Sequence, residues 1–177
     1  KKVDVLLNNA GRMFFTYEGT VQGLEMTMGV NHFSHAYLTD LLFESLAPNA
    51  RIINVSSAAN EMSDAAALKG DIDFDRFLNY PKNGYSANGA YSFSKLANIL
   101  FTKALAKFSN EKKLALKSVS LHPGVVDADY LSITKFRQLI SFIGRPFFWA
   151  FFKNKEEGAQ TTLQCIFEDV GRTSFAR

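Results

Sequence analysis

The stretch Val3-Asp-Val-Leu-Leu-Asn-Asn-Ala-Gly11 sets the pattern of the chain: a short apolar run that ends in a turn. Short apolar runs closed by Asn and Gly are typical of buried strands, because these residues adopt the turn conformations that end a strand. Two similar runs follow at Arg51–Ser56 and Leu116–Leu121, and Pro123-Gly124 closes the second of them. We therefore predict a buried strand at Val3–Asn8 and at each of the two later runs.

Segments with helical spacing separate these runs. We expect one long helix over Thr20–Leu46, which ends before Pro48, and further helices over Ala90–Phe108 and Lys155–Phe167. Strands that alternate with helices form a parallel sheet with right-handed crossovers and helices on both faces. The pattern therefore predicts one α/β domain over residues 1–177, built on a doubly wound parallel sheet.

Two long segments lack this periodicity. Asp64–Asn88 is polar and rich in Gly and Asp, so we expect a loop there. Leu131–Phe152 is irregular and strongly aromatic, and its apolar part, 139–152, is interrupted by Gly144-Arg145-Pro146 and too short to cross a membrane. Such a patch requires an apolar partner, so 131–152 is interpreted as a substrate lid that also touches a membrane surface, with core covering as the alternative.

The composition excludes several classes of protein. Of the 177 residues 47% are hydrophobic and 21% charged, and the net charge of +3 comes without a dense basic stripe, which argues against nucleic-acid binding. Cys165 is the single cysteine, so we expect no disulfide and no zinc site. His32 and His35 are interpreted as packing or interface residues rather than metal ligands. We expect a cytoplasmic protein and leave a peripheral position on an intracellular membrane open.

Tyr91 and Lys95 are the strongest candidates for chemistry. Within Tyr91-Ser-Phe-Ser-Lys95 they stand four residues apart, so on a helix they share one face. A free phenol has a pKa of about 10, and a neighbouring cation lowers it. Tyr91 is then a usable general acid or base for an alcohol or carbonyl oxygen. The pair alone is a weak signal, because this spacing is also common on a solvated helix face.

Two further polar residues have positions that suit a site. Ser57 follows the predicted strand Arg51–Ser56, and open α/β sheets bind ligands outside this edge. The other interpretation of Ser57 is a cap or turn residue. Asn31 falls within a predicted helix, where Asn is unfavourable unless its amide is bonded. The other interpretation of Asn31 is an exposed side chain.

Five motifs occur together in one order along the chain. They are Asn8-Asn9-Ala10-Gly11, Gly29-Val30-Asn31-His32-Phe33, Asn54-Val55-Ser56-Ser57, Ala90-Tyr91-Ser92-Phe93-Ser94-Lys95-Leu96-Ala97-Asn98 and His122-Pro123-Gly124-Val125-Val126. With these motifs the chain resembles the short-chain dehydrogenase/reductase family, and within it the retinol-dehydrogenase-like group. The resemblance implies a Rossmann-like fold and an oxidoreductase that uses NADP or NAD, with NADP slightly favoured.

The resemblance also implies a role for each matching residue. Tyr91 would donate or accept the proton, while Lys95 would hold the nicotinamide ribose and lower the pKa of Tyr91. Ser57 would steady the substrate oxygen, and Asn31 would anchor a water that links Lys95 to solvent. The implied cofactor contacts are Asn8, Ala10 and Gly11 on the adenosine side, Tyr91 and Lys95 at the ribose, and Pro123, Gly124 and Val126 beside the nicotinamide.

Three departures from the family pattern stand out. The Thr-Gly-x-x-x-Gly-x-Gly turn, whose helix binds the pyrophosphate, does not occur in these residues, so we interpret the chain as a fragment without the N-terminal βαβ units. Asp127-Ala128 stands where the family usually has a threonine that contacts the nicotinamide. A closing strand would follow Val170, but 171–177 is polar, so we predict a divergent terminus there.

We therefore expect an enzyme that interconverts a hydrophobic alcohol, retinoid- or lipid-like, and its aldehyde or ketone. The alternative is a truncated, inactive relative that acts as a binding or regulatory domain. The Tyr91 and Lys95 pair argues against a domain for another nucleotide ligand, and the lack of a Gly-x-Ser-x-Gly motif argues against a serine hydrolase. A homodimer and membrane contact through 139–152 are left open.

Overall fold

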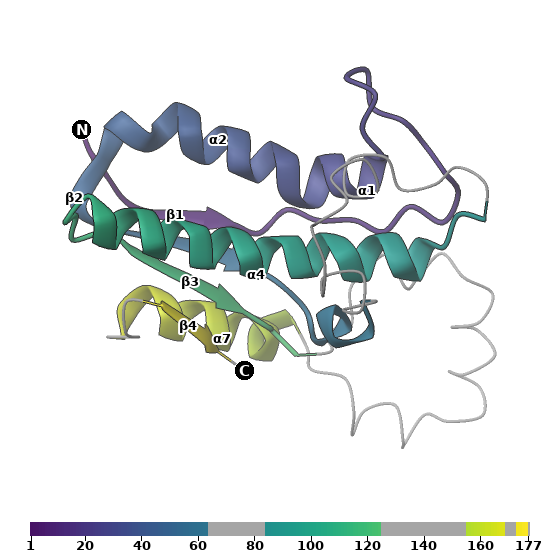
Figure 1. The fold of residues 1–177 in the computed structure, drawn as a ribbon. Helices are drawn as coiled ribbons and strands as arrows, with labels where there is room; N and C mark the ends of the chain where they lie inside the picture. The colour runs from purple at the N-terminus through teal and green to yellow at the C-terminus, as the bar shows by residue number, and fades with distance from the viewer. Residues whose placement is uncertain (64–83, 125–154, 169–172, 177) are drawn as a thin grey trace.

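Four parallel strands form the centre of the structure (Figure 1). The computed structural model describes residues 1–63, 84–124, 155–168 and 173–176. The strands lie side by side in chain order: β1 (Val3–Asn8), β2 (Leu46–Val55), β3 (Lys117–Leu121) and β4 (Thr173–Ala176). Because parallel neighbours cannot be joined by tight hairpins, the chain crosses over the sheet between each pair of strands.

Helices cover both faces of this sheet. α2 (Ser34–Leu42) and the long α4 (Ala87–Glu111) lie over one face, and α7 (Lys155–Phe167) lies over the other (Figure 1). Four short pieces flank them: α1 (Met26–Met28), the π-helical turn η1 (Gly29–Phe33), and the 3-10 turns η2 (Phe43–Ser45) and η3 (Ala58–Met62). The predicted α/β class and the parallel sheet are confirmed.

Neighbouring residues of β2 belong to two separate hydrophobic cores, one on each face of the sheet, because successive strand side chains point to opposite faces. Ile52 packs in the core under α4 with Leu105, and Ile53 packs in the core under α7 with Cys165. Cys165 is fully buried on its helix. Arg51 adds a polar link, since its guanidinium donates to the Cys165 backbone oxygen at 2.9 Å. The sheet and α7 are thereby joined by both apolar and polar contacts.

The prediction of one helix over Thr20–Leu46 is wrong at both ends. Thr20 begins a turn instead, in which the Gly23 N–H donates to the Thr20 carbonyl at 2.9 Å. Gly23 has a φ of 84°, which a glycine adopts without strain. The Glu25 carboxylate then accepts two backbone N–H groups of α1 at 2.8 Å, so the helical part begins only at Met26.

The strand predicted at Arg51–Ser56 also begins earlier than expected, at Leu46. The pairing of β1 with β2 shifts register between Val3 and Val5. A register shift leaves backbone groups outside the ladder, so the strand passes Pro48, which has no N–H to donate. The helix predicted from Ala90 likewise starts earlier, because Ser86 accepts the Gly89 N–H at 3.1 Å and caps α4.

The expectation that no strand closes the sheet after Val170 is wrong. β4 pairs in parallel with β3, with Ser118 opposite Thr173 and Leu121 opposite Ala176. Ladder hydrogen bonds use backbone groups, so a polar segment can extend a sheet where its neighbour offers an open edge. The loop predicted over Asp64–Asn88 falls mostly outside the described residues, and the segment 131–152 falls entirely outside them.

A ladder of buried polar side chains crosses the sheet beneath α4. Asn8 of β1 donates to the Asn54 Oδ1 of β2 at 2.8 Å, and Asn54 donates to the Thr102 Oγ1 of α4 at 2.9 Å. The ladder continues at both ends, since Thr39 accepts from Asn8 at 3.1 Å and Ser118 donates to the Thr102 carbonyl at 2.8 Å. The ladder thus sets the position of two helices relative to three strands.

Substituting the central member of this ladder is expected to destabilise the protein. In Asn54→Ala, the buried Asn8 amide and Thr102 hydroxyl each lose a partner that water cannot replace, so the free energy of unfolding falls by about 1–3 kcal/mol. Urea unfolding of the full-length protein measures the change. Asn49→Ala is the control, because Asn49 lies on the same strand but is exposed. Equal stability of the two variants would contradict the prediction.

Candidate active site

The sequence-predicted site residues converge on one edge of the sheet. Ser57 follows the carboxyl end of β2, Gly11 follows that of β1, and Pro123 follows that of β3. Because the strands are parallel, these three ends meet at the same edge. The N-terminal half of α4, which carries Tyr91 and Lys95, lies over this edge (Figure 1).

Lys95 places its ammonium beside the ring of Tyr91. The Lys95 Nζ lies 5.5 Å from the centre of the Tyr91 ring, as the four-residue spacing predicts. Tyr91 is half-buried, whereas Lys95 is only 4% exposed. The ammonium donates to the Val55 carbonyl at 3.1 Å. Burial lowers the pKa of Lys95 to about 8, so a buried cation that readily loses its proton stands next to the phenol.

Asn31 is fully buried, so its interpretation as an exposed side chain is wrong. It lies in the π-helical turn η1, a widened helical turn of a kind often found at functional sites. Its Oδ1 accepts the Arg12 N–H at 2.7 Å, and its Nδ2 donates to the Ser94 Oγ at 3.0 Å. Its carbonyl accepts from His35 and Asn98, both at 3.1 Å. The asparagine therefore connects the segment after β1 to α4.

Ser57 is half-buried and begins the turn η3. Its Oγ accepts the Ala59 N–H at 3.2 Å, so the capping interpretation of this residue describes a contact that is present. A hydroxyl can accept two hydrogen bonds and donate one, so capping does not use the proton that a substrate oxygen would receive. The capping and catalytic interpretations of Ser57 are compatible.

The predicted cofactor residues differ in their accessibility. Asn8 is 1% exposed, and its side chain belongs to the ladder beneath α4. Ala10 and Gly11 are exposed, and Pro123 and Gly124 are half-buried. Gly124 has a φ of 90°, which favours glycine at this turn. Val126 lies outside the described residues.

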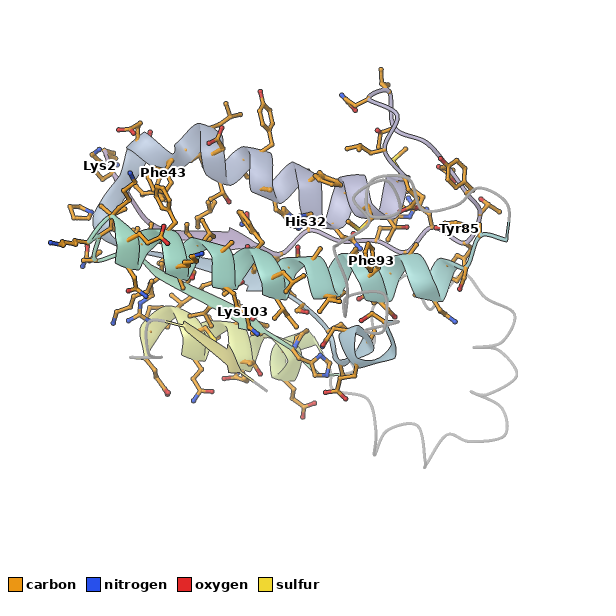
Figure 2. All side chains as sticks on the ribbon, in the orientation of Figure 1. Lys2, His32, Phe43, Tyr85, Phe93 and Lys103 are labelled. Atoms are coloured by element: carbon orange, nitrogen blue, oxygen red, sulfur yellow. The ribbon has the colours of Figure 1, made fainter. Side chains whose placement is uncertain are left out.

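The sequence did not indicate the pair formed by the buried Glu25 and the half-buried Tyr85. The Tyr85 hydroxyl lies 3.0 Å from the Glu25 Oε1, 2.9 Å from the Phe14 carbonyl and 3.3 Å from the Thr27 Oγ1. Its ring meets that of Tyr17 edge-to-face, with centroids 5.7 Å apart. Figure 2 shows Tyr85 where the chain enters α4, beside the loop that follows β1. The pair therefore joins that loop to the helix that carries Tyr91.

Removal of the Tyr85 hydroxyl is expected to weaken this junction. Tyr85→Phe deprives a fully buried carboxyl group of a hydrogen-bond donor, so the free energy of unfolding falls by about 1–3 kcal/mol. Chemical denaturation checks the value. Tyr37→Phe serves as the matched substitution, because Tyr37 is 65% exposed, and its stability is expected to stay within about 0.5 kcal/mol of the wild type.

Asn31 is surrounded by three further residues, which sequence analysis did not assign to the site. Asn98 and Ser94 lie on the face of α4 that carries Lys95, and His32 follows Asn31 in η1. The spacing of Ser94 and Asn98, four residues apart around Lys95, is the signal that could have found them. The interpretation of His32 and His35 as packing residues is confirmed, since both are buried and hydrogen-bonded.

Comparison with known proteins matches the chain to one family. A family model described as short chain dehydrogenase matches residues 1–68. Retinol dehydrogenase 11 of Mus musculus is 41% identical over 167 residues, which cover 93% of this chain and 48% of that protein. Retinol dehydrogenase 13 of Homo sapiens is 37% identical over 179 residues, which cover 98% and 51%. This chain is similar to short-chain dehydrogenases along almost its whole length. It spans about half the length of the curated relatives it matches.

Solved structures with similar chains show the fold. Salutaridine reductase of Papaver somniferum aligns with a TM-score of 0.69 at 20% identity, over 99% of this chain and 72% of that one. A protein of Mycobacterium Paratuberculosis aligns with a TM-score of 0.59 at 36% identity, over 86% and 51%. The fold is therefore the Rossmann-like fold that the sequence resemblance implies.

The described residues contain neither a metal-binding cluster nor a membrane-spanning helix. No group of three or more His, Cys, Asp and Glu side chains there could hold a metal ion. No helix in the described part of the chain is long and apolar enough to cross a membrane. The apolar segment 139–152 lies outside this part.

Proposed function

We propose that the full-length protein is an NADP- or NAD-dependent oxidoreductase that interconverts a hydrophobic alcohol and its aldehyde or ketone. The observation that carries the proposal is the buried Lys95 ammonium beside the Tyr91 ring at the carboxyl edge of a parallel sheet. Similarity to short-chain dehydrogenases supports it.

The residues at this edge fit a nicotinamide cofactor. A Cβ added at Gly11 would lie 3.3 Å from both the Lys95 Nζ and the Asn31 Oδ1. Glycine at this position therefore avoids a close contact with the ammonium. An ammonium with donors to spare suits ribose hydroxyls, so Lys95 would hold the nicotinamide ribose. Asn8, Ala10 and Gly11 would lie toward the adenosine, and Pro123, Gly124 and Val126 toward the nicotinamide. The cofactor, when bound, supplies or receives the hydride.

Tyr91 moves the proton in the proposed mechanism. In the oxidising direction its phenolate accepts the proton of the substrate hydroxyl, and in the reducing direction its phenol donates that proton to the carbonyl oxygen. The nearby positive charge of Lys95 stabilises the phenolate and so lowers the pKa of Tyr91. Ser57 keeps its hydroxyl proton for the substrate oxygen, because its Oγ acts as an acceptor toward Ala59.

We further propose that the substrate is apolar and retinoid- or lipid-like. The curated relatives named above are retinol dehydrogenases, whose name states an apolar alcohol. The strongly aromatic segment 131–152 adds support from composition, because apolar side chains favour an apolar ligand.

Turnover assays on the full-length protein test the proposal. The protein is mixed with NADPH or NADH and apolar aldehydes and ketones, or with the oxidised cofactors and apolar alcohols including retinol, and the reduced nicotinamide is followed by absorbance. We expect turnover of apolar substrates with a preference for NADP over NAD. Absence of both turnover and cofactor binding would contradict the proposal and favour a binding or regulatory domain.

A further inference from the structure

Asn98 bridges two backbone carbonyls at the centre of the site. It lies on α4 one turn beyond Lys95 and is 2% exposed. Its Nδ2 donates to the carbonyls of Asn31 and Val55, at 3.1 Å in each case. One carbonyl belongs to the π-helical turn η1 and the other to the end of β2. A single side-chain amide therefore ties a helix, a strand and a π-helical turn together.

The orientation of this amide follows from its partners. Backbone carbonyls can only accept hydrogen bonds, so the Asn98 nitrogen must face them and its Oδ1 must face the other way. The Oδ1 lies 3.1 Å from the His32 Nδ1, which must then carry a proton. His32 lies between α2 and α4 (Figure 2). Burial lowers the pKa of His32, so near neutral pH its ring is uncharged and its one proton is on Nδ1.

The Val55 carbonyl is shared between Asn98 and the Lys95 ammonium. Lys95 donates to it at 3.1 Å, and Asn98 donates to it at the same distance. A carbonyl oxygen has two lone pairs, so these two bonds complete its set. The Asn31 carbonyl likewise accepts from two side chains, Asn98 and His35. Asn98 is therefore the side chain that donates to both carbonyl oxygens.

We propose that Asn98 is a positioning residue, which fixes the Lys95 ammonium relative to Asn31 and Tyr91 by holding its carbonyl acceptor against the π-helical turn. It acts through Lys95, because its side-chain contacts are with His32 and the carbonyls of Asn31 and Val55. Its consequence for turnover rests on the proposed function. His32 has a supporting part, because it fixes the direction of the Asn98 amide.

Loss of the bridge has a consequence that can be measured. In Asn98→Ala the ammonium keeps a carbonyl that is no longer anchored, and water gains access to the space left by the amide. Less desolvation raises the pKa of Lys95 toward its ordinary value. Among the described residues, the titratable groups that face the ammonium are Tyr91 on α4 and His35 on α2, and His32 in η1 bonds Asn98 itself. None of these three is altered by the substitution.

The test compares full-length wild type, Asn98→Ala, Asn98→Ser and the control Thr102→Val. Asn98→Ser shortens the side chain so that it no longer reaches both carbonyls, and it adds no charge that would shift the pKa of Lys95 by itself. It carries the test if Asn98→Ala does not fold. Thr102 is equally buried one turn further along α4 and belongs to the ladder. Its hydroxyl donates to the Asn98 backbone carbonyl at 2.9 Å and not to the side-chain amide, so Thr102→Val lowers stability and keeps both donors of the bridge.

Two measurements are made on each protein: the pH dependence of kcat and KM, and the titration of the Lys95 side chain by NMR, assigned with Lys95→Met. Both Asn98 variants are expected to raise the apparent pKa of Lys95 by about half a unit or more. We also expect kcat to change more than the substrate KM. Thr102→Val is expected to shift neither.

The outcomes separate the two proposals. Wild type that turns over no substrate, together with a shifted Lys95 titration in the Asn98 variants, overturns the proposed function and leaves the positioning of Lys95 in place. An active wild type whose pH profile and Lys95 titration are the same in the Asn98 variants as in Thr102→Val overturns the inference.

Discussion

Tyr91→Phe is expected to lower the kcat of the full-length protein by about 10²–10⁴-fold, because the substitution removes the hydroxyl that transfers the proton and leaves the ring in place. Tyr91 is half-buried on the exterior of α4, so the change of one oxygen atom leaves the helix and its packing intact. Steady-state kinetics with the best substrate of the turnover assay measure the effect.

Tyr37→Phe is the control for the loss of a phenol, because Tyr37 lies on α2 with its side chain 65% exposed. We expect it to turn over at the wild-type rate. Cofactor binding to Tyr91→Phe is measured by titration, to show that the site is still assembled. Wild-type turnover by Tyr91→Phe would sink the proposed mechanism.

Lys95→Met is expected to stabilise the fold near neutral pH while it removes most of the turnover. Burial holds the pKa of Lys95 at about 8 in the folded protein, against an ordinary value of 10.5. That difference corresponds to about 3 kcal/mol of unfavourable free energy when the buried group is charged. Methionine fills a similar volume without a charge, so Lys95→Met does not carry this unfavourable free energy.

The pH dependence of stability follows from the same pKa values. Below pH 8 the folded and unfolded states both hold the proton, and the folded state bears the full unfavourable term. Between pH 8 and 10.5 the folded state releases a proton that the unfolded state still binds, so the free energy of unfolding rises with pH. We expect this rise in wild type relative to Lys95→Met, measured by urea unfolding at a series of pH values.

Lys103→Met provides the comparison, because Lys103 is an exposed lysine further along α4 (Figure 2). Its stability curve is expected to run parallel to that of wild type. If Lys95→Met were less stable than wild type at neutral pH, the ammonium would be a net source of stability and the argument from burial would be wrong.

The pattern of apolar residues predicted the sheet and the bounds of α7, because the spacing of these residues along the sequence indicates which side chains are buried. Val3–Asn8 and Lys155–Phe167 match the observed elements at both ends. The start of α1 was not predictable in this way, since Glu25 is not a typical cap residue and reaches the first turn only where the fold buries it. β4 escaped prediction because its pairing depends on the open edge of β3.

The candidate site was predictable where one element carries the geometry, as α4 does for Tyr91 and Lys95. Asn98 stood in the same quoted motif, but its role depends on a helix, a strand and a π-helical turn that meet only in the folded chain. The same holds for Tyr85, whose partners lie 60 and 71 residues away in the sequence.

The π-helical turn at Gly29–Phe33 also limits how the length of this chain can vary. Such a turn holds one residue more than the α-helical path requires, so deletion of a single residue would let the helix close into regular α geometry. Each residue of an α-helix advances by about 100°, and the deletion would rotate Asn31 away from α4 or carry His35 and Thr39 out of contact. Functional homologues should therefore tolerate substitutions along this turn far better than changes in its residue count.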